Sequence, residues 1–185
     1  IIGTRQDGIS TGNHITIGTN DRDQETNRAI ISKTNPEIKG GIFAIDGSYV
    51  NFYDGILKGG SNYVNDEAIV KATPDGAHRV VETVGDEEHC WLEEDEDYLQ
   101  VGNKTFNSLT AAYEEVQDGG TVYVIADATT AAVLPDNTKN ITFDLGAFTL
   151  NYSQPLLNSG TMKIVGTTGK IITNNPHLPA IDNSG

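Results

Sequence analysis

Short segments with an apolar residue at every second position recur along the chain, at residues 14–18, 43–52, 140–145 and 161–166. Successive side chains of a strand point to opposite faces, so this alternation predicts short strands with one buried face. The segments are closed by Gly, Asn or Asp, which adopt the backbone conformations of tight turns. The chain is therefore expected to be mainly β.

The segments also repeat over a longer period. The tripeptide Asn-Ser-Gly at residues 158–160 returns at 183–185, 25 residues further on. A spacing of about 21 to 25 residues suits one coil of a three-sided β-helix, in which stacked strands bury their inward side chains in a continuous column. An antiparallel sandwich is the alternative, although hairpin signals are scarce among the repeats. The side chains expected to point into one or two such columns are Ile15, Ile17, Val50, Phe52, Ile141, Phe143, Met162 and Ile164.

One segment has helical periodicity instead. Apolar residues at positions 106, 109, 113 and 116 follow the three-and-four spacing of one helical face. Thr105 is the expected N-cap, and Gly119-Gly120 ends the helix before a strand at residues 121–125. A helix in this place would cover the open end of a column of coils and protect its strand edges.

A different unit lies between two regions of coils. Residues 77–92 predict a hairpin with a loop at 85–87, and the turn Thr-Pro-Asp-Gly at 73–76 precedes it. The acidic run at 93–97 is expected to be a solvated connector, because its carboxylates repel one another. The expected domains are the end of a first β-helix module (1–71), a β-hairpin and acidic connector (72–98), and the helix-capped start of a second β-helix module (99–185).

Residues 40–59, which contain the sequences GGIFAIDG and NFYDGILKG, resemble an element of large adhesin-like cell-surface proteins of Gram-positive bacteria. In those proteins, pectin-lyase-like right-handed β-helix coils alternate with small β linkers. The stretch at 73–92 looks like such a linker, and 105–125 looks like the start of the next β-helix. The resemblance implies right-handed parallel β-helix coils, a short capping helix, an intervening β-hairpin linker and a secreted or cell-surface, extracellular location. The polar, irregular insertion at 20–36 departs from the pattern.

Charge and length exclude several classes of protein. The 185 residues include 12 Lys and Arg against 26 Asp and Glu, a formal net charge of -14, which repels nucleic-acid phosphates and anionic lipid heads. No segment approaches the roughly 18 to 20 apolar residues of a membrane span. We therefore expect no nucleic-acid partner and no membrane insertion. The single cysteine, Cys90, cannot form an intrachain disulfide and is expected to be a small apolar strand residue.

Polysaccharide hydrolases and lyases also have this fold, so we examined the sequence for the catalytic residues that such enzymes require. A hydrolase needs two or three carboxylates that converge on neighbouring coils, and the coil-associated candidates are Asp46, Asp54 and Asp144. Asp46 and Asp54 each precede a Gly, so a role in turns explains them better. A lyase needs a basic residue beside an acidic calcium cluster, and Lys163 and Lys170 lie near no such cluster in the sequence.

Metal-binding patterns are incomplete. Asp21, Asp23 and Glu25 copy the first ligand positions of a calcium loop, but Thr26 replaces the required Gly and Ser32 the bidentate Glu. A looser calcium site stays open, and so does an intramolecular cross-link between Lys and Asn. The four histidines, His14, His78, His89 and His177, are scattered and lack ligand spacing. The one tryptophan, Trp91, lies on the hairpin and not on a coil, where a packing role is expected. No catalytic residue, cofactor or metal ligand is assigned.

These observations favour a non-catalytic structural or adhesive segment of a bacterial cell-surface protein, acting as a rigid β-helix spacer or presentation surface. The alternative is a carbohydrate-active β-helix enzyme, a polysaccharide hydrolase or lyase, or a glycan-binding module. The expected partners are a host or microbial surface glycan or protein and the flanking domains of the same longer chain. A longer chain is expected because the repeat stops at 183–185, where the earlier copy continues into a strand.

Overall fold

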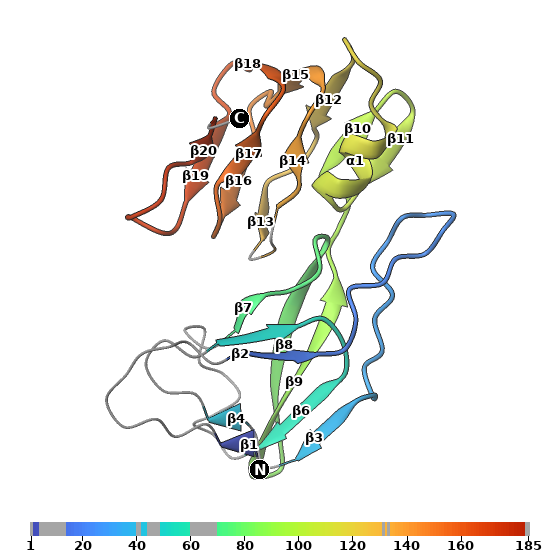
Figure 1. Ribbon diagram of the computed structural model, residues 1–185, viewed down its shortest axis with the longest axis vertical. Coiled ribbons are helices and arrows are strands. Elements are labelled where there is room, and N and C mark those ends of the chain that lie inside the picture. Colours follow the sequence, from blue (N-terminus) through green and yellow to red (C-terminus); the bar gives the residue numbers. More distant parts are fainter. Residues whose placement is uncertain are drawn as a thin grey trace.

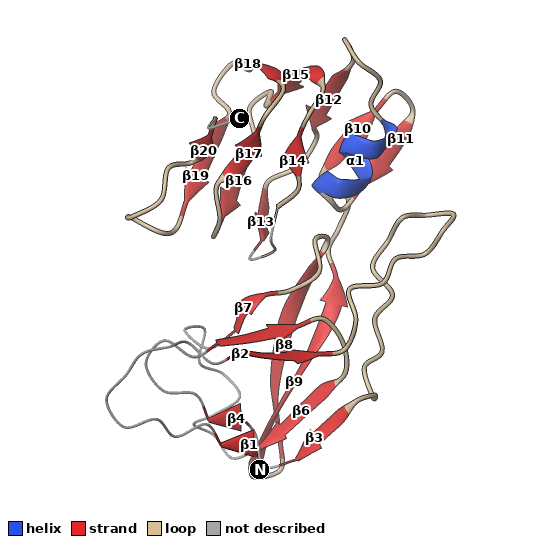
Figure 2. Ribbon diagram, viewed as in Figure 1, coloured by secondary structure: helices blue, strands red, loops and turns tan. Residues whose placement is uncertain are grey.

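The computed structural model describes residues 2–3, 14–39, 42–43, 49–59, 70–130, 132 and 134–183. They form an elongated, mainly β molecule with one group of stacked parallel strands at each end, a β-solenoid architecture (Figure 1). The helix α1 (Leu109–Glu115) is the one helix among the described residues (Figure 2). The expected fold of right-handed parallel β-helix coils with a short helix is confirmed. Below, residues 2–97 are the N-terminal half and residues 98–183 the C-terminal half.

The C-terminal half contains three coils of three strands each. Their parallel pairing places equivalent strands in one sheet, so that β15 lies between β12 and β18, β16 between β13 and β19, and β17 between β14 and β20. Thr121 pairs with Thr142 and Thr142 with Lys163, which gives the 21-residue period of one coil wall. The strands are β12 (Thr121–Val124), β13 (Ala128–Thr130), β14 (Asp136–Asn137), β15 (Asn140–Asp144), β16 (Thr149–Tyr152), β17 (Leu156–Asn158), β18 (Thr161–Val165), β19 (Lys170–Thr173) and β20 (Ile181–Asp182).

The three walls enclose one hydrophobic core. Phe143, Leu150 and Leu156, one from each wall of the middle coil, have no exposed surface. Ile141 and Phe143 are buried as expected, and Met162 packs against the core as a partly buried residue. Ile164 was expected in the core but is 40% exposed, because β18 is the edge strand of its sheet and no described strand follows it.

Hydrogen bonds between equivalent asparagines align the turns of successive coils. Asn137 Nδ2 donates to Asn158 Oδ1 at 2.6 Å, and Asn158 Nδ2 donates to Asn183 Oδ1 at 2.5 Å. Asn158 and Asn183, the first residues of the two Asn-Ser-Gly copies, therefore mark the same corner of consecutive coils. Gly160 follows this corner, and a Cβ atom there would lie 2.4 Å from the carbonyl oxygen of Lys139, so the close stacking of the coils requires a glycine.

The helix begins later than expected. Its N-cap is Ser108, whose hydroxyl accepts from the backbone N–H of Ala111 at 3.2 Å. Thr105 was expected in this role but lies in strand β11 (Lys104–Phe106), which pairs with β10 (Leu99–Val101) in an antiparallel hairpin. Both residue types cap helices, so the pairing of β11 decides which one does. No helix in the described part of the chain has the length and apolar content of a membrane span.

The helix covers the first coil, as expected of a capping element. Leu109, Ala112 and Tyr113 are buried in the core of the C-terminal half. The last turn has no basic residue of its own, but Lys139, between β14 and β15, donates from Nζ to the carbonyl oxygens of Tyr113 at 2.5 Å and Val116 at 2.7 Å. A cation at the carbonyl end of a helix satisfies its free acceptors. Lys139 thus holds α1 against the coils.

The N-terminal half repeats the coil pattern on a smaller core. Parallel pairs join β1 to β4, β2 to β5, β5 to β7 and β3 to β6. Ile17, Val50 and Phe52 are buried in its core as expected, and Ile15 is partly buried against them. The strands are β1 (Ile2–Gly3), β2 (His14–Ile17), β3 (Glu37–Lys39), β4 (Ile42–Phe43), β5 (Tyr49–Phe52), β6 (Ile56–Gly59) and β7 (Val70–Ala72).

The expected hairpin is formed by β8 (Ala77–Val84) and β9 (Glu87–Glu94). Its loop contains two residues, Gly85 and Asp86, and is shorter than the expected loop at 85–87 because Glu87 pairs with Val84. Strand β9 also pairs with β6, so the hairpin continues the sheet of the N-terminal coils. Whether residues 72–98 behave as a separate domain stays a prediction.

Phe143→Ala is expected to lower the free energy of unfolding by about 3 to 5 kcal/mol, because the buried ring would leave a cavity in the column. Tyr123→Ala is the matched control, since the side chain of Tyr123 on β12 is 45% exposed. Urea denaturation followed by circular dichroism measures both changes. A loss below about 1 kcal/mol for Phe143→Ala would place this ring outside the core.

Candidate functional site

The two halves meet at a junction that the polar insertion reinforces. Residues 18–36, which connect β2 to β3 and are called the strap below, extend from the N-terminal coils toward α1 (Figure 1). Arg22 and Ala29 form an isolated antiparallel bridge within it, so the strap doubles back on itself. Its tip lies beside α1 and β11, which are far away in the sequence.

Arg22 joins three segments at this junction. Its Nη1 donates to the carbonyl oxygen of Asn27 at 2.6 Å and to Ser108 Oγ, on the N-cap of α1, at 3.2 Å. Its Nη2 donates to the carbonyl oxygen of Asp75 at 2.8 Å. One guanidinium thus links the strap, the turn that precedes β8 and the start of the helix, and its planar arrangement of donors suits such a role.

The turn at residues 73–76 contacts the helix directly. Asp75 Oδ2 accepts from the backbone N–H and the hydroxyl of Thr110, at 2.8 and 2.9 Å. Burial raises the pKa of Asp75, and the bonds from Thr110 oppose this shift. The turn has the predicted form, because Gly76 has a φ of 87°, and a Cβ there would lie 2.8 Å from Asn107 Oδ1. A glycine is therefore required where the two halves touch.

The acidic run carries partners and is not a free solvated connector. Arg28 of the strap pairs with Glu94 at 2.8 Å and with Asp97 at 2.7 Å. Lys33 pairs with Glu93 at 2.6 Å. His78 Nδ1 lies 2.8 Å from Asp95, whose pKa is raised by burial against the opposing effect of His78. The expected repulsion is thus offset by the cations of the strap and by the contact between Asp95 and His78 on β8. These pairs are partly exposed to solvent, so each one alone is weak.

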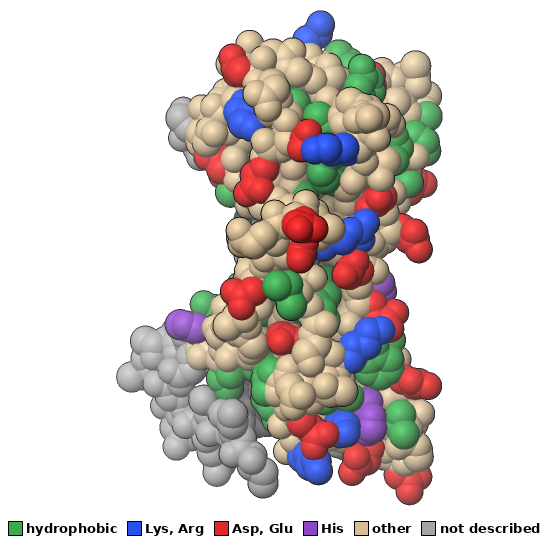
Figure 3. Space-filling view, turned by 90° about the vertical axis from the view of Figure 1, so that its right-hand side faces the viewer, with side chains coloured by type: hydrophobic (Ala, Val, Ile, Leu, Met, Phe, Trp, Pro, Cys, Tyr) green, Lys and Arg blue, Asp and Glu red, His purple; other side chains and the backbone are tan. Residues whose placement is uncertain are grey.

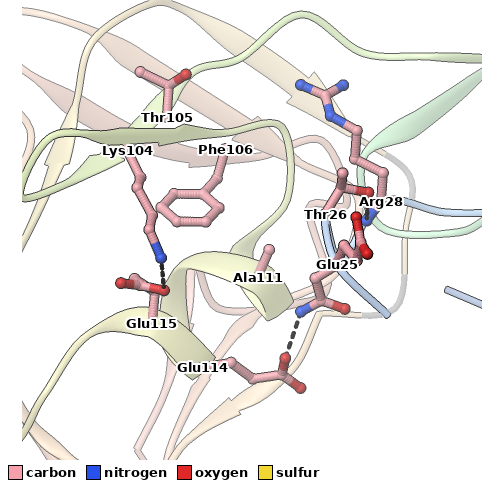
Figure 4. A pocket seen from close by; sticks show the side chains of 10 residues that line it. Glu25, Thr26, Arg28, Lys104, Thr105, Phe106, Ala111, Glu114 and Glu115 are labelled. Atoms are coloured by element: carbon pink, nitrogen blue, oxygen red, sulfur yellow. Dashed lines mark hydrogen bonds and ion pairs between the residues drawn. The ribbon is translucent and has the colours of Figure 1, made fainter. Parts of the chain in front are cut away.

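A cleft of about 400 Å³ opens between the strap and the C-terminal half (Figure 4). Two interactions cross or border it: Asn27 donates to Glu114, and Lys104 pairs with Glu115 at 2.8 Å. The half-buried ring of Phe106 lines the cleft between Lys104 and α1. The lining residues are Glu25, Thr26, Asn27, Arg28, Lys104, Thr105, Phe106, Ala111, Glu114 and Glu115.

The chemistry of the cleft suits an uncharged polar ligand. Three of the lining residues are acidic and two are basic, and both basic residues, Arg28 and Lys104, already hold carboxylates. An anionic ligand would therefore find no unpaired cation among the lining side chains. The ring of Phe106 offers an apolar surface. Thr26 and Asn27 also line the cleft with neutral polar side chains, although the Thr26 hydroxyl and the Asn27 amide already donate to Asp23 and Glu114.

Two of the catalytic candidates are turn residues. Asp54 Oδ1 accepts from the backbone N–H groups of Ser32, at 2.5 Å, and Gly55, at 2.7 Å. Asp144 Oδ1 accepts from the N–H of Gly146 at 2.9 Å. The two carboxylates lie in different halves and are not brought together. Asp46 lies outside the described residues, and the exposed Lys163 and Lys170 lie on β18 and β19, away from the cleft.

The calcium-like residues form a turn of the strap. Asp23 Oδ1 accepts from the N–H groups of Glu25 and Thr26 and from the Thr26 hydroxyl, and these bonds lower its pKa. Asp21 accepts from the hydroxyl of Thr19 at 2.6 Å. Across the described ranges, no group of three or more His, Cys, Asp or Glu side chains is placed to hold a metal ion.

The remaining candidate residues are dispersed. His14 stacks on Tyr49 with ring centroids 5.2 Å apart, and His177 is exposed beyond β19. Trp91 donates from Nε1 to Glu93 at 3.1 Å.

Cys90 is fully buried on β9 as expected, and burial raises the pKa of its thiol to about 11, so the thiolate that a nucleophile needs is disfavoured. His89 Nε2 lies 3.7 Å from Glu87.

Searches against protein-family models, curated proteins and solved structures found no match to this chain.

Asp75→Asn is expected to change how stability depends on pH. The folded-state pKa of Asp75 is raised, so its favourable contribution is complete below the ordinary value for Asp and is lost as the pH rises through the folded pKa. Asn keeps an oxygen for the Thr110 donors and carries no charge. The stability of the variant minus that of the wild type should therefore increase as the pH rises from about 4. Chemical denaturation across the acidic to neutral range measures this difference, and a flat or decreasing difference would contradict it.

Proposed function

We propose that this chain is a non-catalytic structural or adhesive segment of a bacterial cell-surface protein, in which two groups of β-helix coils form one rigid spacer or presentation surface. The observation that carries the proposal is the strap. Arg22 and Arg28 tie it to the turn before β8, to the acidic run and to the N-cap of α1. A flexible connection between two coil modules would not need these hydrogen bonds and ion pairs.

Rigidity is the property that such a spacer requires. In a solenoid each coil contacts its neighbours, so the weakest point is where the stacking is interrupted. Here the interruption lies between β9 and β10, where the chain leaves one set of coils and enters the next. The space-filling view shows basic and acidic side chains along the narrow waist between the halves (Figure 3). The strap adds contacts at this point, and this supports the role of a rigid spacer or presentation surface.

The surface location and the partners belong to the same proposal. The resemblance of residues 40–59 to adhesin-like Gram-positive surface proteins supports secretion and display, and a net charge of -14 suits an exposed segment that remains soluble. The proposed partner is a surface glycan or protein of a host or of another microbe. Flanking domains of a longer chain would provide anchoring.

Removing the two strap arginines should loosen the junction. Small-angle X-ray scattering of Arg22→Ala/Arg28→Ala at about 0.15 M ionic strength is expected to show a broader distance distribution than the wild type. Lys163→Ala/Lys170→Ala is the matched control, because it removes two cations from exposed positions on β18 and β19. A wild-type protein that already samples many orientations, or a double strap variant that scatters like the wild type, would contradict the rigid-spacer role.

Glycan binding at the cleft is a second candidate function, and the ring of Phe106 in a cleft without an unpaired cation favours it. We expect neutral oligosaccharides to bind better than acidic ones such as pectins. Phe106→Ala should weaken binding about tenfold, whereas Tyr123→Ala, which removes an exposed aromatic ring from β12, should not. Calorimetric titration with a panel of neutral and acidic glycans measures this. Preferential binding of acidic glycans, or equal binding by both variants, would exclude the cleft.

The same glycan panel tests catalysis. A structural or binding module should release no product from pectins, glucans or mucin glycans, with or without calcium, as checked by chromatography of the reaction mixture. Turnover that disappears in Asp46→Asn, Asp54→Asn or Asp144→Asn would replace the structural proposal with that of a β-helix hydrolase or lyase.

A further inference from the structure

A second polar cluster lies under α1, separate from the cleft, where the turn before β8 meets the core of the C-terminal half. It consists of Asp75 Oδ1 and the hydroxyl groups of Tyr98, Tyr113 and Tyr152, none of which has a hydrogen-bond partner. All four residues are buried, and the most accessible of them, Tyr113, is 6% exposed. Buried polar groups in proteins are nearly always hydrogen-bonded, so four such atoms require an explanation.

Four separate segments bring these groups together. Asp75 is held against the first turn of α1 by its bonds to Thr110, and Tyr113 follows Thr110 by three residues, which places both on one side of the helix. Tyr98 precedes β10 and Tyr152 ends β16. The rings of the three tyrosines belong to the hydrophobic core.

The groups also act on one another electrostatically. The carboxyl group of Asp75 contributes to raising the pKa of each of the three tyrosines, although burial is the larger cause. The hydroxyl of Tyr152 interacts with those of Tyr98 and Tyr113. The hydroxyls of Tyr98 and Tyr152 approach each other, and Asp75 and Tyr113 act on this pair at longer range. None of the four atoms has a partner with full hydrogen-bonding geometry.

We propose that the four groups form a buried water-binding site, in which one or more ordered water molecules bridge Asp75 Oδ1 and the three tyrosine hydroxyls. The packed rings cannot turn to pair their hydroxyls directly, because core side chains occupy fixed rotamers. Water donates two hydrogen bonds and accepts two, so it matches a set of one carboxyl oxygen and three hydroxyls. Such a bridge connects the turn before β8 to α1, to the start of β10 and to the second coil.

A metal cation suits the site less well than water. It would occupy the oxygen lone pairs of the hydroxyls and leave their three protons with Asp75 Oδ1 as the one acceptor of the cluster. Positive charge is also already present, because Arg22 donates to the carbonyl oxygen of Asp75. Water provides the missing acceptors without adding charge.

Magnetic relaxation dispersion of ¹⁷O in water tests the proposal on the full chain, because it detects internal water molecules with long residence times. The wild type should show such a signal, and Tyr152→Phe should reduce it, since this change removes one hydroxyl and keeps the ring. Tyr123→Phe, at an exposed tyrosine, is the matched control and should leave the signal unchanged. Tyr98→Phe and Tyr113→Phe provide independent repeats if one variant fails to fold.

The outcomes separate the alternatives. Loss of signal in the variants at the cluster, but not in Tyr123→Phe, supports the water site. A wild-type protein without long-lived internal water, or cluster variants that fold and keep the full signal, would overturn it. A thermal stability that rises with added Na⁺ or K⁺ beyond the effect of choline chloride, and only with the tyrosine hydroxyls intact, would replace water with a cation. These measurements do not depend on the spacer or glycan-binding roles.

Discussion

Stacking between coils is the interaction on which the rest of this structure depends. Each strand has two to five residues in the coils of the C-terminal half, too few to bury an apolar face alone. Parallel pairing with the next coil places Val122 beside Phe143 and Phe143 beside Ile164, so the inward side chains form columns. Burial within a column decreases where pairing stops, and the exposure of Ile164 on the edge strand β18 shows this.

The same requirement explains the helix and the antiparallel strands at the other end of the sheet. An uncovered first coil would expose apolar side chains and the hydrogen-bonding edge of β12. Strand β10 pairs with that edge, and α1 buries Leu109 and Val116 against the core. The bonds from Lys139 to the helix carbonyl groups then hold the cover to the coil. The covering elements are therefore part of the solenoid and its core.

Between the two sets of coils, polar interactions replace the hydrophobic column. The guanidinium of Arg22 and the carboxyl of Asp75 join segments from both halves, and Arg28 neutralises part of the acidic run. Interactions of this kind are weak when exposed and stronger when partly buried and hydrogen-bonded. Hydrogen bonds and ion pairs form only in particular orientations of their groups. A junction made of several such contacts is therefore directional and restricts how the two halves are oriented, whereas a purely apolar contact restricts this less. This directionality supports the spacer proposal and also creates the cleft beside Phe106.

Much of the candidate site lay beyond prediction from the sequence. A turn role for Asp54 follows from the glycine after it, and the contacts of Asp54 to backbone N–H groups agree. The contact of Asp144 to the N–H of Gly146 is seen only in the structure. The strap was seen as a polar insertion, but its role depends on Arg28 meeting Glu94 and Asp97 across 66 and 69 positions of the chain. Opposite charges in two irregular segments were a signal for this, but charge alone does not specify which groups pair.

The sequence by itself determined the local structure: short strands, a repeat near 21 residues, the corners at Asn158 and Gly160, the hairpin of β8 and β9, and one helix. These follow from side-chain alternation and from the backbone preferences of single residues, which act over a few positions. Only the tertiary structure decided that Ser108 and not Thr105 caps the helix, that the acidic run is paired, and that Asp75 and three tyrosine hydroxyls are buried without a partner. The reason is physical: each of these outcomes depends on groups distant in the sequence, and their proximity is created by the stacking of the coils.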